Sequence, residues 1–424
     1  MVLGFVVATG ALGAQSLVVR ASATPCLNVR STPQSGAPAL ACILPGATVT
    51  GDSAVPFWRR VRTVDGTRGW AAKKFLDTVA TPAVPTGNPV PAAGPNAIPD
   101  SAWLEIHIVD VGQGDGIWIA THDDGKAGNN RFDGRNIVID GGPDGSDSRN
   151  EFLKYLRSHA HDGAVIDGLI VTHPHNDHYP GARGILRHFD VCHYYDPDTP
   201  NGPDFDDFLI QLDSARCGGA PIVKHRGLAS FGMPAWGTEL GVDFVWGGPI
   251  VPSGMGSGGT LINNNSVVLK LTYGTQSFLF MGDAEGKERG DPASTPRYAE
   301  KGMLDNPAVA AKLKSTLLKI AHHGSETSST LPFIAAVRPE ILIVSSGRRA
   351  YSGTFLPDAS TLHRYCAQIP GIRIYRTDQN DEAEGRTTTT DADGDHIVIR
   401  TNGARTIVEA RSGGQPFTPG PCVP

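Results

Sequence analysis

Short apolar runs separated by glycine-rich turns recur along the chain from position 104 onward. Residues 104–111, 117–120 and 136–139 are rich in isoleucine and valine. Runs of this length and composition are typical of buried strands. Residues 151–159 instead carry apolar side chains at helical spacing, which predicts an amphipathic helix. Strands and a helix in succession indicate a layered α/β architecture.

One apolar run ends in an unusual group of polar residues. Residues 169–172 are followed at once by three histidines and one aspartate, namely His173, His175, Asp177 and His178. Imidazole and carboxylate together suit zinc, manganese or iron. The alternative is a polar helix start that is merely capped by Asp177 and His178. A metal centre is favoured because the ligand spacing and the preceding strand agree.

Two later apolar runs also end in potential ligands. Residues 277–281 precede Asp283, and residues 317–321 precede His322 and His323. Ligands at the ends of several strands are held by a rigid scaffold. The sequence therefore predicts that these three segments meet at one edge of a sandwich.

The first quarter of the chain has a different composition. Residues 1–23 are apolar with small residues at the end, which predicts a secretory signal; a buried first strand is the alternative. Residues 24–79 contain short β-rich pieces separated by turns, as in a small all-β barrel. Residues 80–102 form a Pro/Ala-rich linker. The main domain is expected over residues 103–411, with a tail over 412–424.

Composition narrows the functional classes. The 424 residues suggest two or three domains, and the 51 glycines and 32 prolines make a helix bundle improbable. The formal net charge of −6 gives no overall attraction to nucleic acid, so binding a polyanion would require a local basic patch. Outside the predicted signal, no apolar run is long enough for a transmembrane segment.

Six cysteines are dispersed along the chain. An even number in an exported protein suggests disulfides, and a secreted or periplasmic location agrees with this. Neighbours in sequence could pair as 26–42, 192–217 and 366–422, although six cysteines allow fifteen pairings. Buried free thiols are the alternative if the protein is cytosolic.

The motifs resemble those of the metallo-β-lactamase superfamily, whose hallmark His-x-His-x-Asp-His matches residues 173–178. Further strings resemble the metal-dependent domain of the ComEC/Rec2 competence protein family, in the expected order. They are Asp110-Val111-Gly112-Gln113-Gly114-Asp115, Val138-Ile139-Asp140-Gly141-Gly142, Asn263-Asn264-Asn265-Ser266-Val267-Val268-Leu269, Gly282-Asp283, Leu318-Lys319-Ile320-Ala321-His322-His323-Gly324-Ser325 and Arg376-Thr377-Asp378-Gln379. The resemblance implies an αββα sandwich.

The resemblance also implies two divalent metal ions, with zinc or manganese as the candidates. His173 and His175 would hold metal one, and Asp283 would bridge. The ligands of metal two would be Asp177, His178 and His323. His322 would support the ligands or donate a proton; the alternative is a buried histidine bonded to backbone.

One ligand of the superfamily pattern is missing. Where many members carry a third histidine for metal one, this chain has three consecutive asparagines, Asn263, Asn264 and Asn265. An amide oxygen is a poor zinc ligand but a fair one for manganese or magnesium. Three histidines elsewhere are substitutes in principle, although none follows an apolar strand into the site: His188, His193 and His225.

Acids and basic residues near the motifs complete the candidate site. Asp110 and Asp140 could orient the metal-binding histidines, or merely cap turns. Four basic residues could clamp a phosphate or be solvated loop charges: Lys319, Arg348, Arg349 and Arg376. The residues expected to take part in catalysis are Asp177, His322 and Lys319.

The N-terminal pieces resemble the bacterial SH3 family. The strings are Leu-Asn-Val-Arg-Ser over residues 27–31 and Gly-Trp-Ala over residues 69–71. This likeness implies a module that binds a cell-wall component, and the alternative is a spacer without a ligand.

Three functions follow from these features. The first is a secreted phosphodiesterase or nuclease, in which two cations hold a hydroxide that attacks phosphorus. The second is a metal-dependent hydrolase of small esters, lactones or lactams, since one fold serves many chemistries. The third is a non-catalytic wall-binding protein with a vestigial hydrolase body.

Overall fold

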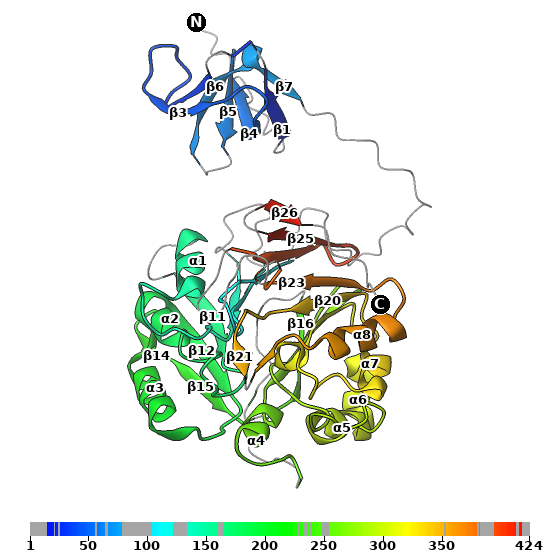
Figure 1. The fold of residues 1–424 in the computed structure, drawn as a ribbon. Helices are drawn as coiled ribbons and strands as arrows, with labels where there is room; N and C mark the ends of the chain where they lie inside the picture. Colours follow the sequence, from blue (N-terminus) through cyan, green and yellow to red (C-terminus); the bar gives the residue numbers. More distant parts are fainter. Residues whose placement is uncertain are drawn as a thin grey trace, which may run out of the picture. The chain divides into compact units, whose positions relative to one another are not determined.

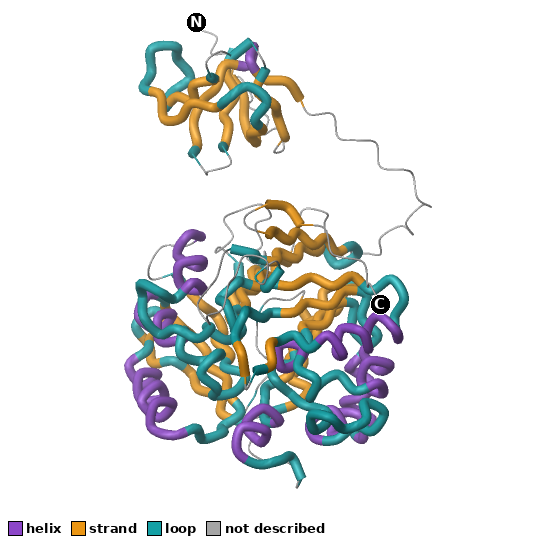
Figure 2. Tube along the Cα trace, viewed as in Figure 1, coloured by secondary structure: helices purple, strands orange, loops and turns teal. Residues whose placement is uncertain are grey.

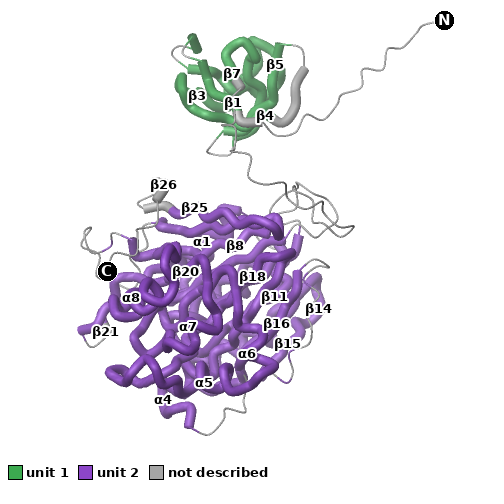
Figure 3. The backbone as a smooth tube through the Cα atoms, turned by 90° about the vertical axis from the view of Figure 1, so that its right-hand side faces the viewer, with its two compact units in different colours: residues 1–92 green, residues 93–424 purple. Residues whose placement is uncertain are grey.

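The computed structural model divides into two compact units, residues 1–92 and residues 93–424 (Figure 3). It describes residues 15–20, 22–23, 26–55, 57–63, 67–78, 104–121, 134–159, 164–227, 229, 231, 236, 240–247, 254–351, 353–379, 381, 394–412 and 415–417. The predicted linker, residues 80–102, lies outside these residues. Most of the predicted tail, residues 412–424, also lies outside them.

The N-terminal unit is an all-β module, as predicted. Its seven strands form one antiparallel sheet in the order β3-β2-β6-β5-β4-β1-β7. The strands are β1 (Gln15–Val19), β2 (Leu27–Arg30), β3 (Ala39–Ile43), β4 (Thr48–Val55), β5 (Trp58–Arg62), β6 (Arg68–Ala72) and β7 (Leu76–Thr78), with a 3₁₀ turn, η1, over Lys73–Phe75. Its apolar core includes Val29, Val49 and Val61.

The end of the predicted export signal belongs to this sheet. Strand β1 pairs with both β4 and β7, and Leu17 and Val19 are buried in the core. A segment with two partner strands contributes to folding, so the buried-strand alternative describes Gln15–Val19 better than a removable signal does. Residues 1–14 lie outside the described part.

The second unit contains a nine-stranded sheet in the order β15-β12-β11-β10-β9-β8-β24-β25-β26. Its strands are β8 (Leu104–Ile108), β9 (Ile117–Ala120), β10 (Asn136–Ile139), β11 (Val165–Ile170), β12 (Asp190–Asp196), β15 (Val223–Arg226), β24 (Ile397–Thr401), β25 (Thr406–Ser412) and β26 (Gln415–Phe417). Strands β10, β11, β12 and β15 run parallel to one another. The strands predicted over residues 104–111, 117–120 and 136–139 correspond to β8, β9 and β10, which are neighbours in this sheet.

A six-stranded sheet packs against the first in the order β16-β17-β18-β19-β20-β23. Its strands are β16 (Leu240–Trp246), β17 (Val268–Tyr273), β18 (Gln276–Phe280), β19 (Leu317–Lys319), β20 (Ile341–Val344) and β23 (Arg373–Arg376). Two short hairpins, β13 (Arg216–Cys217) with β14 (Ala220–Pro221) and β21 (Ala350–Tyr351) with β22 (Thr354–Phe355), lie outside both sheets.

Helices cover the outer face of each sheet (Figures 1 and 2). The nine-stranded sheet carries α1 (Glu151–His159), α2 (Ala182–His188) and α3 (Gly202–Ser214). The six-stranded sheet carries α5 (Tyr298–Asp305), α6 (Pro307–Leu313), α7 (Leu331–Val337) and α8 (Ala359–Gln368), while α4 (Gly258–Asn264) precedes β17. The layers are helix, sheet, sheet, helix, which confirms the predicted αββα sandwich.

Alternation along the strands creates the three apolar layers. In β10, Ile137 and Ile139 face the other sheet, whereas Val138 faces the helices. In β20, Ile341 faces the other sheet and Leu342 faces the helices. Successive side chains of a strand point to opposite faces, so a continuous apolar run is buried on both sides. This is why the strands lack polar alternation.

Two of the suggested disulfide pairings are present. Cys26 bonds to Cys42 across β2 and β3, and Cys192 bonds to Cys217 across β12 and β13. Cys366 is also disulfide-bonded, and its partner lies outside the described residues. Among the residues that the structure describes, no helix has the length and apolar character needed to cross a membrane.

Candidate metal centre

Three chain segments bring the candidate ligands to one edge of the sandwich. His173, His175, Asp177 and His178 occupy the loop that follows β11. Asp283 lies shortly after β18, and His322 and His323 lie in a 3₁₀ turn, η3 (Ala321–Gly324), after β19. Each loop leaves the carboxyl end of a strand that has at least one parallel neighbour, which is the usual location of a site in an α/β protein.

The predicted ligands form two of the four three-residue groups in the described part of the chain whose donor atoms lie within 4.8 Å of one another. The first group is His173, His175 and Asp283. The second group is Asp177, His178 and His323. These are the sets that the resemblance implied, with Asp283 counted in the first. The histidine and carboxylate donors of both groups fit divalent metal ions.

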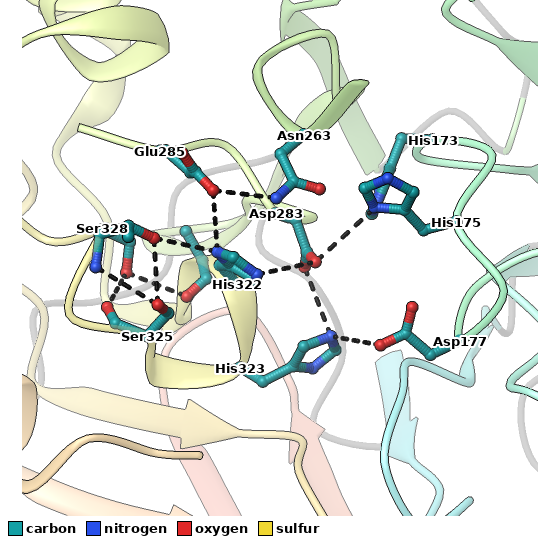
Figure 4. A network of polar contacts seen from close by, with 12 residues as sticks. His173, His175, Asp177, Asn263, Asp283, Glu285, His322, His323, Ser325 and Ser328 are labelled. Atoms are coloured by element: carbon teal, nitrogen blue, oxygen red, sulfur yellow. Dashed lines mark hydrogen bonds and ion pairs between the residues drawn. The ribbon is translucent and has the colours of Figure 1, made fainter. Parts of the chain in front are cut away.

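Asp283 lies between the two groups (Figure 4). Its Oδ2 atom is 3.6 Å from His173 Nε2 and 3.4 Å from His178 Nε2, and its Oδ1 atom is 3.5 Å from His323 Nε2. Oδ1 is buried without a hydrogen-bond partner. A buried carboxylate oxygen costs free energy unless something satisfies it, so this position fits a bridging metal ligand.

Neighbouring groups orient the imidazoles. Asp140 Oδ2 is 2.8 Å from His178 Nδ1, and the backbone oxygen of Ser345 is 2.8 Å from His323 Nδ1. Each contact uses Nδ1 and leaves Nε2 directed into the site, as is usual for metal-binding histidines. Asp140 also accepts hydrogen bonds from the backbone N–H and hydroxyl of Thr172. It therefore holds the loop as well as the ring.

The backbone at the third segment is strained. His322 and His323 both adopt left-handed conformations, with φ of 49° and 51°. Such conformations are uncommon for residues other than glycine and cluster at functional sites. The turn is held by hydrogen bonds from His322 N to Gly282 O and from Ser325 N to His322 O. This conformation presents both rings toward Asp283.

The electrostatics of His173 and Asp283 suit a cation. Burial and the neighbouring His178 hold the pKa of His173 well below its usual range, which favours the neutral imidazole. Burial opposes the charged form of Asp283, but His323 and His178 outweigh it and hold its pKa well below normal. A neutral imidazole beside an ionised carboxylate is the state that a metal requires.

Asn263 occupies the position where the third histidine of metal one was missing. Its amide nitrogen donates to Glu285 Oε1 at 2.9 Å, whereas its Oδ1 atom is buried without a hydrogen-bond partner. In Figure 4 this oxygen points away from Glu285 and toward the side of the site that holds His175. An orphaned amide oxygen beside His175 and Asp283 fits an additional metal contact. Asn264 instead bonds to backbone groups.

His322 lies at the rim of the centre. Its Nε2 atom is 3.9 Å from Asp283 Oδ2, and its Nδ1 atom is 3.1 Å from Glu285 Oε1 and 3.0 Å from Thr327 Oγ1. Burial disfavours the imidazolium, but the carboxylates of Asp283 and Glu285 outweigh it and raise the pKa of His322. A charged, partly exposed imidazole in this position could donate a proton.

A cavity of about 810 Å³ opens above the centre. His175, Asp177, Asp283 and His322 line it. Arg349 and Arg289 also line it, and they supply the positive charge of the wall. Arg289 forms a bidentate ion pair with Asp358, which holds its guanidinium in place.

Some predicted roles are wrong. Lys319 is fully buried and forms an ion pair with Asp115, so it cannot clamp a phosphate in the cavity. Asp110 accepts hydrogen bonds from Gly112 and Gly394 in a turn, which agrees with the capping alternative.

The other predicted histidines and arginines lie elsewhere. His188 pairs with Asp147, and His193 contacts His225 between β12 and β15. Neither contact belongs to the metal centre. Arg348 lies over the Phe355 ring and Arg376 pairs with Asp378, so only Arg349 of the predicted arginines lines the cavity.

Three contributors were missed as site residues. Asp115 lies 3.6 Å from His323 Nδ1 and 3.9 Å from His178 Nδ1, and Lys319 balances its charge. Its place in the Gly114-Asp115-Gly116 turn before β9 was a usable signal, because Asp140 and Asp283 also lie next to a glycine in a loop beside a strand. Glu285, two residues after Asp283, could have been found in the same way. No local pattern marks Arg289.

Comparison with known proteins agrees with this geometry. The metallo-beta-lactamase superfamily model matches residues 131–348, slightly more than half of the chain. The chain therefore belongs to the metallo-beta-lactamase superfamily, which consists of metal-dependent hydrolases. The match spans all three ligand-bearing segments.

Curated relatives refine the placement. The chain is 28% identical over 267 residues to "Uncharacterized protein YcaI" of Escherichia coli and 27% identical over 281 residues to "Recombination protein 2" of Haemophilus influenzae. It is 25% identical over 292 residues to "ComE operon protein 3" of Bacillus subtilis. These matches cover 62%, 64% and 65% of this chain but only 28%, 28% and 32% of the relatives. The resemblance to the competence protein family is thereby confirmed for the second unit.

Among solved structures, the metallo-beta-lactamase fold protein YhfI from Bacillus subtilis aligns at 11% identity with a TM-score of 0.35. The alignment covers 64% of this chain and 96% of that one.

Proposed function

We propose that the second unit hydrolyses phosphodiester bonds of nucleic acid with the help of two divalent metal ions. The observation that carries this proposal is the pair of three-ligand groups meeting at Asp283, at the floor of a cavity lined by Arg289 and Arg349. Two cations a few ångströms apart suit an in-line displacement at phosphorus. The fold alone serves many chemistries, and a guanidinium on the cavity wall, that of Arg349, favours phosphate over a neutral ester.

Each residue of the site would have its own role in phosphodiester hydrolysis. The bound metals would lower the pKa of an attacking water and offset charge that develops on the phosphate. Asp140 and the Ser345 carbonyl fix His178 and His323, so the donor set is organised before substrate arrives. Arg349 faces the cavity and would bind a non-bridging oxygen. His322 would protonate the departing oxygen from the rim, where Glu285 supports its charge.

Nucleic acid as the substrate is supported by the relatives. One of them is named Recombination protein 2, and recombination is a process of DNA. Both single-stranded and double-stranded nucleic acids are proposed substrates.

Manganese is the metal that the first group suits best. Its protein donors are His173, His175, the bridging carboxylate and the Asn263 amide oxygen. Hard oxygen donors favour manganese or magnesium relative to zinc, which prefers nitrogen and sulfur. The second group, with two imidazoles and one carboxylate, suits zinc or manganese equally.

The activity is proposed to take place outside the cytoplasm. The Cys26–Cys42 and Cys192–Cys217 disulfides support this, because such bonds persist in oxidising compartments.

Two substitutions test the proposal. Asp177→Ala and His175→Ala each remove one metal donor, so hydrolysis of bis-p-nitrophenyl phosphate and of a labelled oligonucleotide should fall at least a hundred-fold. Metal content, measured by mass spectrometry of the purified protein, should fall in parallel. His188→Ala is the control, because His188 pairs with Asp147 away from the site.

Full activity in either variant would sink the assignment of the ligands. Turnover of a homoserine lactone or a nitrocefin-type lactam, with none of any phosphodiester, would replace the nuclease proposal with the small-ester alternative.

A further inference from the structure

A second cavity lies wholly within the N-terminal unit. It has a volume of about 600 Å³ and is enclosed by β2, the β4–β5 turn and the η1 turn. Aromatic and basic side chains line it together: Phe57, Trp58, Phe75, Arg30, Lys73 and Lys74. Among the described residues, no acid lines this cavity. A concave surface of this composition suits an anionic ligand with flat rings.

The charge of the N-terminal unit contrasts with that of the rest of the chain. Residues 1–92 contain eight Lys and Arg against three Asp, for a net charge of +5, whereas the whole chain has −6. The remainder is therefore strongly acidic. Lys73 and Lys74 are exposed, and neither pairs with an acid in the described part of the chain. This unit supplies the local basic patch that binding a polyanion requires.

The aromatic side chains are placed to meet a ligand. Phe57 is 83% exposed in the turn between β4 and β5, and its backbone has a φ of 66°. A bulky residue in the left-handed region is an outlier, and an exposed phenyl ring gains nothing from packing. Strained conformations of this kind cluster at functional sites. Trp58 is half-buried next to it, so two rings border one cavity.

We propose that this cavity binds single-stranded nucleic acid. Bases would stack on Phe57 and Trp58, and the phosphates would contact Lys73, Lys74 and Arg30. Aromatic platforms beside a positively charged groove are the usual means of holding a single strand without reading its sequence. The site is separate from the metal centre. It would deliver or retain a strand that the second unit cleaves, because linked sites raise effective concentration.

A cell-wall peptide is the other ligand that a module of this kind suggests. Charge complementarity favours nucleic acid, because three cations line the cavity and a nucleic acid carries one negative charge per nucleotide. A peptide strand would not require that concentration of positive charge. Binding to a cell-wall peptide is therefore treated as an alternative result of the experiment below.

The experiment measures binding with hydrolysis switched off. The full chain with Asp177→Ala, in EDTA, is titrated into fluorescein-labelled oligo-dT and followed by anisotropy. Lys73→Glu with Lys74→Glu should weaken binding at least ten-fold and reduce the slope of log K against log salt by about 1.4. Phe57→Ala should weaken binding at least five-fold and leave binding of inorganic polyphosphate, which has no bases, unchanged.

A matched double variant separates the cavity from general charge. Arg62→Glu with Arg68→Glu changes the net charge by the same amount on the same sheet, outside the cavity, and should weaken binding less than three-fold. Circular dichroism and thermal melting show whether each variant remains folded. Since Phe57 is exposed, its replacement should not affect folding.

Several outcomes would overturn the proposal. They are no binding of oligo-dT by the parent chain, equal losses in the two double variants, or retention by purified peptidoglycan that Phe57→Ala abolishes while oligo-dT binding persists. The catalytic proposal fails separately. A chain that binds oligo-dT through this cavity but cleaves no phosphodiester would remove the proposed function and leave this site intact.

Discussion

Asn263 is the residue at which this chain departs most from a histidine-rich metal site. Its amide nitrogen is fixed by Glu285, so its oxygen has one orientation, toward the first ligand group. The buried carboxylate of Glu285 thus selects which end of the amide faces a metal. An oxygen donor in place of an imidazole shifts the preference of the site toward harder cations.

Replacing Asn263 should change metal preference before it changes the fold. Asn263→Ala removes the oxygen and should weaken binding of manganese to the first group at least ten-fold. Asn263→His offers a nitrogen and should raise the affinity for zinc relative to manganese. Titration calorimetry and the electron paramagnetic resonance signal of Mn²⁺ measure both effects. Asn306→Ala, at an exposed helix cap, is the control.

Unchanged affinities for both metals in the two Asn263 variants would show that the amide makes no metal contact. The orphaned oxygen would then need another partner, such as an ordered water.

The ligands could be predicted from the sequence because each follows an apolar strand at once. His173, Asp283 and His323 all satisfy this rule, and the strands meet at one edge. Lys319 also lies at a strand end, and its predicted role was wrong because its side chain is buried and pairs with Asp115. The direction of a side chain depends on packing between the sheets, which no local pattern records.

At the scale of elements, a buried carboxylate ties α5 to the start of α7. Glu300 accepts hydrogen bonds from the backbone N–H groups of Ser329 and Thr330 and from the Thr330 hydroxyl. Burial raises the pKa of Glu300, although these donors act in the opposite direction. Glu300 holds the segment around Ser329 and Thr330. This segment follows η3, which carries His322 and His323, so the contact helps to fix the position of these two histidines.

Glu300→Ala should therefore destabilise the second unit. The change leaves buried donors unsatisfied, at about 1–3 kcal/mol for each group. The free energy of unfolding, measured by urea titration, should fall by about 3 kcal/mol or more. Glu151→Ala is the matched control, because Glu151 forms only a surface pair with Lys154 and should cost less than about 1 kcal/mol. Equal losses in the two variants would contradict the structural role of Glu300.

The elements themselves were only partly predictable. Residues 117–120, 136–139 and 151–159 form the elements that their patterns indicated. Strand β1 was taken for a signal because an apolar run with small residues looks alike in both roles, and only pairing with β4 and β7 distinguishes them. Strand β24 pairs with β8 from nearly three hundred residues away, and no local pattern encodes such a partner.

At the scale of the whole molecule, the two units have separate apolar cores. The core of the N-terminal unit is built from residues between Leu17 and Leu76, and the second unit has three core layers of its own. A domain with its own core can fold alone. The metal centre and its cavity belong entirely to the second unit. The two proposed activities can therefore be separated by dividing the chain.

A chain that begins at residue 93 should keep its hydrolytic activity on small substrates but bind long nucleic acids more weakly. Turnover of bis-p-nitrophenyl phosphate should stay within two-fold of the full chain, because no residue of the cavity above the metals is removed. The KM for a long oligonucleotide should rise at least five-fold, since the basic module no longer retains the strand. Steady-state kinetics with both substrates measure the two effects. A truncated chain that is folded by circular dichroism and binds metal, yet turns over neither substrate, would mean that the N-terminal unit completes the active site.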